Sequence, residues 1–219
     1  CGEFFHWELA TIISAHRLQI NPFDQPNVES AKIAAKEMMK SYAASGSLPE
    51  LTPAIDDGYT KVYTDIEADN PKDALKMFVN RFERGAKDGK GRSYVSIQAF
   101  VKPDSEIDKV LQKLRTTIQT KYRLATTVGY GPRFLHSTGQ LHKGDSGNGL
   151  FIQFTTDNPI DTPIPDEPGS NSSSMSFGIL IHAQALGDRQ ALLDNGRKAI
   201  RFHFRDDIAS GIKDLAEQL

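Results

Sequence analysis

The chain has 219 residues, with 26 Lys and Arg against 28 Asp and Glu, so its formal net charge is −2. Hydrophobic residues make up 38% and charged residues 25%, which is typical of a globular protein. This balance offers no general basic surface for nucleic acid. No apolar run reaches the ~18 residues that predict a membrane span. Cys1 is the only cysteine, so no internal disulfide forms, which fits a cytoplasmic protein.

The N-terminal part of the chain predicts two amphipathic helices, at residues 3–17 and 27–44. The chain starts on Cys1 rather than Met and shows no secretory leader, so we expect it to be a piece of a longer polypeptide. On the second helix Lys32 lies about 40° from Val28, beside the apolar stripe rather than opposite it. On this position alone, Lys32 is more often a lysine at the border of the stripe than a functional residue.

Between these helices the sequence predicts a rigid polar loop, INPFDQPN. Pro22 and Pro26 fix φ and remove two backbone donors. The loop presents Asp24 and Gln25 just before the second helix, which Asn27 is expected to cap.

The remaining chain predicts an α/β fold. Residues 45–69 read as a linker with a short strand at 61–66, and a helix capped by Asn70 follows. From Tyr94, the expected strands are 94–101, 124–130, 149–156 and 199–204, and the expected helices start near 105, 177, 188 and 206. This alternation predicts a mainly parallel sheet flanked by helices. We therefore expect a helical segment at 1–90 and an α/β domain at 91–219.

A glycine-rich segment at 129–149, GYGPRFLHSTGQLHKGDSGNG, follows one of these strands and is expected to be a long loop. Ligands of open α/β sheets bind beyond the carboxyl ends of strands. Its donors suit phosphate and sugar hydroxyls: Arg133, His136, Ser137, Thr138, Gln140, His142 and Lys143. A plain solvated turn is an equal alternative on these residues. A metal site at His136 and His142 finds no support from cysteines or carboxylate spacing, so neither metal nor cofactor is expected.

The segment INPFDQPNVESAK resembles the C-terminal signature of the phosphoglucose isomerase family, roughly F-D-Q-x-G-V-E-x-x-K. Asn27 stands where the family usually has Gly. The helix before this segment is also similar to the family's. The resemblance implies that Gln25 and Lys32 face a sugar phosphate, and that Lys32 takes part in opening the sugar ring.

A second, weaker resemblance lies in HSTGQLHKGD and the following LFIQF, which are similar to the histidine loop of short bacterial phosphoglucose isomerases. In ordinary members that loop precedes the signature, whereas here it follows. The order is more like the C-terminal part of transaldolase–phosphoglucose isomerase fusion proteins. The resemblance implies that His136 helps to open the sugar ring, and that Arg133, Ser137, Thr138 and Gln140 bind substrate.

Together these resemblances imply the C-terminal part of an isomerase that interconverts glucose 6-phosphate and fructose 6-phosphate in a sugar-isomerase-like fold. The family's phosphate loop and glutamate base find no counterpart here. They are expected in an N-terminal part of the same polypeptide, so this fragment alone is expected to be nearly inactive. The alternative is a non-catalytic sugar-phosphate-binding or dimerisation domain. The sequence leaves open whether Lys32 and His136 meet within one chain or across a homodimer.

Overall fold

The protein has an α/β fold built on a mostly parallel sheet, as its sequence predicts. The computed structural model describes residues 1–24, 26–83, 91–157 and 160–219. The sheet has six strands in the order β1-β2-β8-β5-β3-β4. Its strands are β1 (Ile55–Asp56), β2 (Thr60–Tyr63), β3 (Tyr94–Phe100), β4 (Ala125–Tyr130), β5 (Gly149–Thr156) and β8 (Lys198–Phe204). The strands from β8 to β4 are parallel, whereas β2 runs antiparallel to β8 and to β1.

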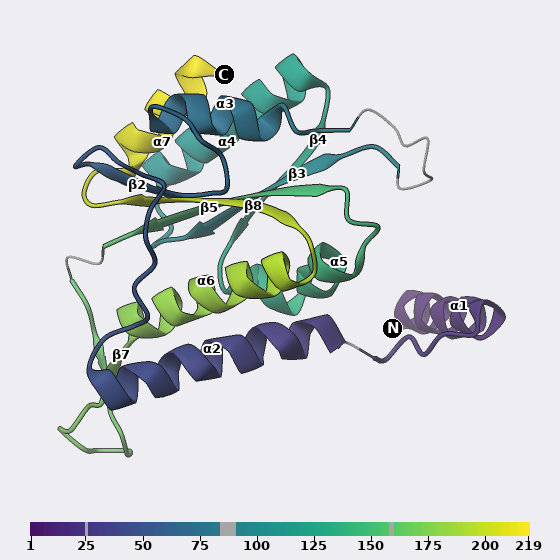
Figure 1. The fold of residues 1–219 in the computed structure, drawn as a ribbon. Helices are drawn as coiled ribbons and strands as arrows, with labels where there is room; N and C mark the ends of the chain where they lie inside the picture. The colour runs from purple at the N-terminus through teal and green to yellow at the C-terminus, as the bar shows by residue number, and fades with distance from the viewer. Residues whose placement is uncertain (25, 84–90, 158–159) are drawn as a thin grey trace.

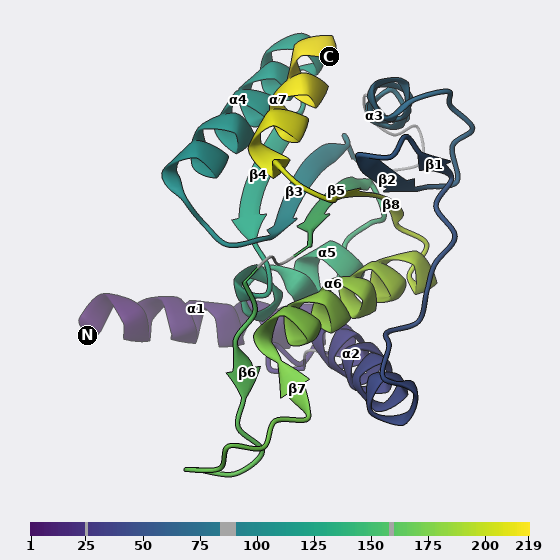
Figure 2. The ribbon, with the colours of Figure 1, turned by 90° about the vertical axis from the view of Figure 1, so that its left-hand side faces the viewer.

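Helices cover both faces of this sheet (Figures 1 and 2). One face carries α3 (Pro71–Val79), α4 (Ser105–Tyr122) and α7 (Ile208–Gln218). The other carries a short 3-10 helix, η1 (Arg133–His136), then α5 (Gly139–Gly144) and α6 (Phe177–Asp194), and α2 (Pro26–Ser45) lies outside α6. A small hairpin of β6 (Pro163–Ile164) and β7 (Met175–Ser176) precedes α6.

The two faces of the sheet differ in chemistry because successive side chains of a strand point to opposite faces. Toward α3, α4 and α7 the strands present aliphatic and aromatic residues, which form the main hydrophobic core. Toward α5 and α6 the three central strands present several buried polar residues: Ser96, Gln98, Gln153, Thr155 and Arg201. The face of the sheet that packs against η1, α5 and α6 is therefore partly polar.

Close backbone contact joins α2 to α6. A Cβ on Gly187 of α6 would lie 2.6 Å from the backbone nitrogen of Ala35. Real Cβ atoms do not approach backbone so closely, so glycine is required for this packing. Val28 and Ala35 of α2 are buried as a result. This contact brings the helix that carries Lys32 onto the η1–α5–α6 layer.

Several local expectations change in the structure. The helix expected at 177–187 and that at 188–195 are one helix, α6. The short strand expected at 61–66 is β2, at Thr60–Tyr63. Although they fall in the segment 1–90 that was expected to be helical, β1 and β2 join the sheet, and α3 packs on its core. Asn70 caps α3 as predicted, since its side chain accepts a hydrogen bond from the Asp73 backbone at 2.9 Å. Within the described ranges, no helix has the length and apolar character needed to cross a membrane.

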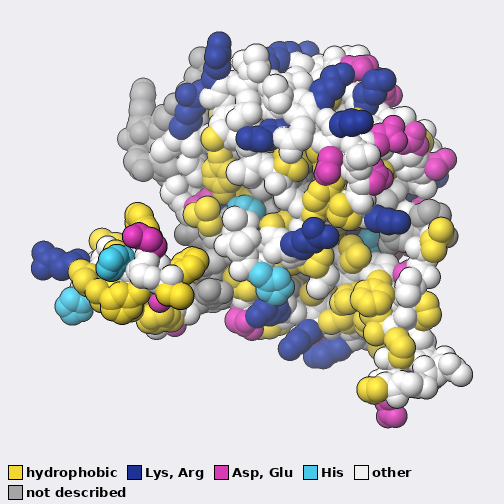
Figure 3. All heavy atoms as spheres, turned by 180° about the vertical axis from the view of Figure 1, so that it is seen from behind, with side chains coloured by type: hydrophobic (Ala, Val, Ile, Leu, Met, Phe, Trp, Pro, Cys, Tyr) yellow, Lys and Arg dark blue, Asp and Glu magenta, His cyan; other side chains and the backbone are white. Residues whose placement is uncertain are grey.

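The first helix, α1 (Gly2–Leu18), projects away from the rest of the molecule (Figures 1 and 2). Ala15 is its buried residue. Large apolar side chains on and just after α1 are exposed: Phe4, Phe5, Trp7, Leu9, Ile12, Ile13, Leu18, Ile20 and Phe23. Figure 3 shows this apolar surface as a separate lobe beside the body of the molecule.

Candidate functional site

The segment expected to be a long loop, 129–149, instead contains η1 and α5. Because these helical turns present different residues on each side, the segment separates two cavities. Leu135, His136, Gly139 and Lys143 line one of them. Residues at intervening positions line the other: Arg133, Phe134, Ser137, Thr138, Leu141 and His142. The predicted site residues are therefore divided between two places.

The first cavity, which we call the Lys32–His136 cavity, has a volume of about 190 Å³. It lies between α2, the η1–α5 segment and α6, and Val28, Ala35, Met39 and Leu180 supply apolar walls. Lys32, Lys36 and His136 supply its basic groups, whereas Lys143, which also lines it, is ion-paired with buried Asp188. No Asp or Glu lines this cavity within the described part of the chain. Lys32 and His136 thus border one cavity within a single chain. A cavity with this lining suits an anionic ligand.

At the rim of this cavity, Lys32 donates a hydrogen bond to Glu29 at 2.6 Å, one helical turn away. This bond, together with the Lys32 charge, lowers the pKa of Glu29. The Lys32 side chain remains about half exposed, at 49%. Exposed pairs of this kind are worth little, so an incoming anion can compete for the ammonium at small cost.

Gln140 connects α5 to α2 by a hydrogen bond and lines neither of the two cavities. Its Oε1 accepts a hydrogen bond from the backbone N–H of Asn27 at 3.0 Å. Asn27, which the sequence predicts as the N-cap, lies inside α2, which begins at Pro26. Gln140 therefore supplies the acceptor for one of the orphan donors in the first turn of α2. Gln25, the other residue expected to face a substrate here, lies outside the described residues.

The second cavity, which we call the Arg133–His142 cavity, has a volume of about 530 Å³. It lies beside the edge strand β4 and the first half of β3, under the η1–α5 segment. Arg133, Ser137 and Thr138 line this cavity and not the one with Lys32 and His136. Their expected grouping with those two residues is therefore not what the structure shows.

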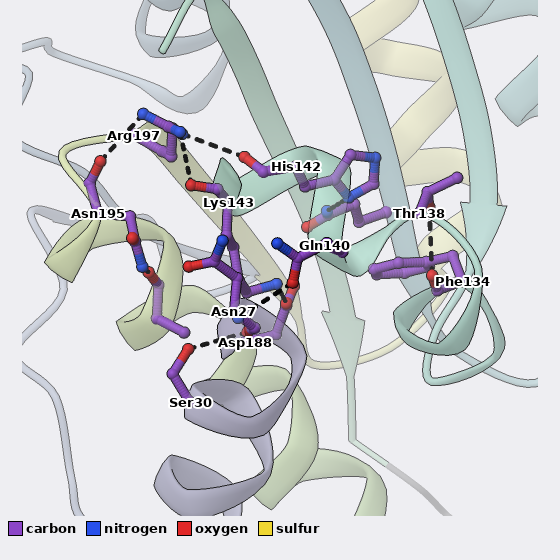
Figure 4. A network of polar contacts seen from close by, with 12 residues as sticks. Asn27, Ser30, Phe134, Thr138, Gln140, His142, Lys143, Asp188, Asn195 and Arg197 are labelled. Atoms are coloured by element: carbon purple, nitrogen blue, oxygen red, sulfur yellow. Dashed lines mark hydrogen bonds and ion pairs between the residues drawn. The ribbon is translucent and has the colours of Figure 1, made fainter. Parts of the chain in front are cut away.

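A buried chain of polar contacts lies between the cavities, and its members were not among the expected site residues apart from the donors His142 and Lys143 (Figure 4). Lys143, expected to be an accessible cation, has no exposed side-chain surface and pairs with Asp188 of α6 at 2.5 Å. Asp188 also accepts from Gln153 at 3.1 Å, and Gln153 donates to Gln98 at 3.1 Å. Gln98 in turn contacts Nδ1 of His142 at 3.3 Å. Because His142 is next to Lys143 in the chain, these five residues form a closed ring, which we call the buried ring.

Burial within this ring shifts the pKa values of Asp188 and His142. Burial raises the pKa of Asp188, and the ammonium of Lys143 opposes that rise. Burial, helped by the charge of Lys143, lowers the pKa of His142 from 6.5 to about 4. His142 also packs between Phe134 and Phe151, with ring centroids at 5.8 and 5.2 Å. The sequence feature that could have indicated this ring is a glutamine in the middle of each of two apolar strands, in the Ile-Gln pairs at 97–98 and 152–153.

Arg197 holds the end of α5 from outside the ring (Figure 4). Its guanidinium donates to the backbone oxygens of His142, Lys143 and Asp145, at 3.1, 2.5 and 2.8 Å. These are carbonyl groups that the end of a helix leaves without partners. An ion pair with the Asp145 carboxylate at 3.2 Å completes the contact. Arg197 thus fixes the C-terminal end of α5, while Gln140 near the start of α5 holds the first turn of α2.

The other two histidines of the α/β layer, His182 and His203, are partly buried and adjacent, with ring centroids 5.5 Å apart. His203 contacts Thr155 at 3.0 Å and Asp157 at 3.2 Å. His182 lies six residues before Asp188 on α6, and His203 lies on β8. Across the described residues, no three His, Cys, Asp or Glu side chains form a group that could hold a metal.

Comparison with known proteins finds a likeness among solved structures but none among family models or curated proteins. The structure is similar to that of a hypothetical protein, TT0462, from Thermus thermophilus, with a TM-score of 0.45 and 16% identity. The match covers 57% of this chain and 34% of that protein, so this chain corresponds to about a third of its length.

Proposed function

We propose that this chain is the part of a sugar-phosphate isomerase that opens the sugar ring of glucose 6-phosphate or fructose 6-phosphate. The observation that carries the proposal is that Lys32 and His136, from segments about a hundred residues apart, border one cavity. Ring opening needs an acid at the ring oxygen and a base at the anomeric hydroxyl. An imidazole can take either role near neutral pH, and an ammonium can donate a proton or stabilise developing charge.

The lining also bears on what this chain does not supply. Aldose–ketose isomerisation requires a base for the proton on carbon 2, and no carboxylate lines the Lys32–His136 cavity in the described ranges. We propose that the base comes from another part of the same polypeptide. The same observation favours the second candidate, a sugar-phosphate-binding module without catalysis.

The test uses the longer polypeptide, assayed with cyclic and with open-chain sugar phosphate. His136→Ala is expected to slow conversion of the cyclic form by roughly 10²- to 10⁴-fold and the open-chain form far less, because only the cyclic form needs ring opening. His142→Ala serves as the matched control, since His142 does not line this cavity. Equal losses for both substrate forms in His136→Ala would remove His136 from ring opening. Binding without turnover in the unmodified polypeptide would select the binding module.

A further inference from the structure

The buried ring determines which nitrogen of His142 carries the proton. The Lys143 ammonium donates to Oδ1 of Asp188, and Gln153 contacts Oδ2 of the same carboxylate. Because a carboxylate only accepts, the Gln153 atom at Oδ2 must be its amide nitrogen. That nitrogen also donates to Oε1 of Gln98. Gln98 must then present its own amide nitrogen to His142, at 3.3 Å from Nδ1. An amide nitrogen only donates, so Nδ1 accepts and the proton of the neutral ring lies on Nε2.

This nitrogen faces an open space. Among the described residues no side chain or backbone oxygen accepts from Nε2 of His142, and Nε2 is not one of the buried side-chain atoms without a partner. It therefore meets accessible space, and His142 lines the Arg133–His142 cavity. Figure 4 shows its ring turned away from Lys143. A neutral histidine whose other nitrogen is already occupied is a fixed hydrogen-bond donor.

Four of the hydroxyls around this cavity already have partners. The hydroxyls of Tyr94 and Tyr130 donate to Asp145 and Asp108, each at 2.6 Å. Those of Ser137 and Thr138 donate to the backbone oxygen of Phe134. Arg133 stands exposed at the rim with its positive charge. Much of the remaining wall is apolar: Ile97, Ala125, Val128, Phe134 and Leu141.

We propose that the Arg133–His142 cavity binds a small carboxylate with an apolar body, with one carboxylate oxygen accepting from Nε2–H of His142 and Arg133 balancing the charge. The apolar wall takes the body of the ligand. The donors select an anion over an alcohol of the same shape, because a hydrogen bond to an ionised acceptor is roughly twice as strong as one to a neutral hydroxyl, and the charge of Arg133 attracts only the anion. This site is separate from the Lys32–His136 cavity and does not depend on isomerase activity.

The test is a titration of the chain with benzoate, followed by backbone and imidazole nitrogen NMR. Before ligand is added, His142 is expected to show a protonated Nε2 and an unprotonated Nδ1, and benzoate is expected to shift Nε2 and residues of the cavity wall. His142→Phe and Arg133→Met are each expected to weaken benzoate binding roughly ten-fold to a hundred-fold. His136→Phe, on the other cavity, is the matched control and should leave the affinity unchanged. Benzyl alcohol should bind much more weakly.

Several results would overturn the proposal. A proton on Nδ1 of His142 in the free protein would show that Nε2 is not a donor. This result needs no variant, whereas His142→Phe also leaves the Gln98 amide unpaired. Unchanged benzoate affinity in the exposed-site variant Arg133→Met would remove the charge contribution. Equal binding of benzyl alcohol, or no response to benzoate at all, would equally exclude a carboxylate site.

Discussion

Lys32 shows how far a single residue can be predicted from a helical pattern. Its position beside the apolar stripe of α2 indicates a partly enclosed side chain, and the structure places it at the rim of a cavity. His142 could not be predicted in this way. Its burial arises from Phe134, Phe151 and Gln98, which come from three different elements. A sequence pattern that covers one element does not contain such contacts.

The lowered pKa of His142 predicts an acid-sensitive stability. The unfolded chain takes up this proton near pH 6.5, whereas the folded protein does so only near pH 4. The unfolded state therefore binds more protons in this window, and stability falls as the pH falls. The His142 contribution is roughly 3 kcal/mol lost between pH 6.5 and 4. Denaturant unfolding at a series of pH values measures it.

His203, whose pKa burial also lowers to about 4, titrates in the same window, so the His142 contribution is the difference between wild type and His142→Phe. The His142→Phe variant is expected to show a shallower decline of stability with falling pH than wild type. Parallel curves for wild type and His142→Phe would show that His142 is protonated alike in both states.

At the scale of elements, glycine content misled the prediction for 129–149. Glycines there permit close packing of short helices, as at Gly144, where a Cβ would lie 2.8 Å from the side chain of Asn27. The four parallel strands β3, β4, β5 and β8 were predicted well because their apolar runs are long. The role of polar strand residues such as Gln98 and Gln153 becomes apparent only when the register of β3 and β5 is known, because that register places the two side by side. Register between distant strands is not visible in either segment alone.

The Lys143–Asp188 pair predicts a double-mutant result. Lys143→Met or Asp188→Leu alone leaves one charge buried without its partner, and each is expected to cost about 3–5 kcal/mol of unfolding free energy. The double variant removes both charges and should recover most of that loss. Urea unfolding of the four proteins gives the coupling. Additive losses in the double variant would mean that the two side chains do not act as a pair.

At the scale of the molecule, alternation of strands and helices predicted the parallel sheet, and the structure confirms it. The addition of β2 to the edge of β8 was not predicted, because it pairs residues about 140 positions apart in antiparallel fashion. The packing of α2 on α6 was equally out of reach of a local pattern, although it brings Lys32 to the same cavity as His136. The division of the candidate residues between two cavities could not be predicted from the sequence, because it depends on this packing.

The most direct test of this account is a titration of the chain with fructose 6-phosphate, followed by backbone NMR. The account predicts shifts at α2 residues around Lys32 and at residues around His136 together, in one saturable process. Lys32→Ala should weaken this binding strongly while the spectrum stays that of a folded protein, and Lys40→Ala, an exposed lysine of α2 away from the cavity, should not. Absence of shifts at both segments, or unchanged affinity in Lys32→Ala, would contradict the assignment of the Lys32–His136 cavity to a sugar phosphate.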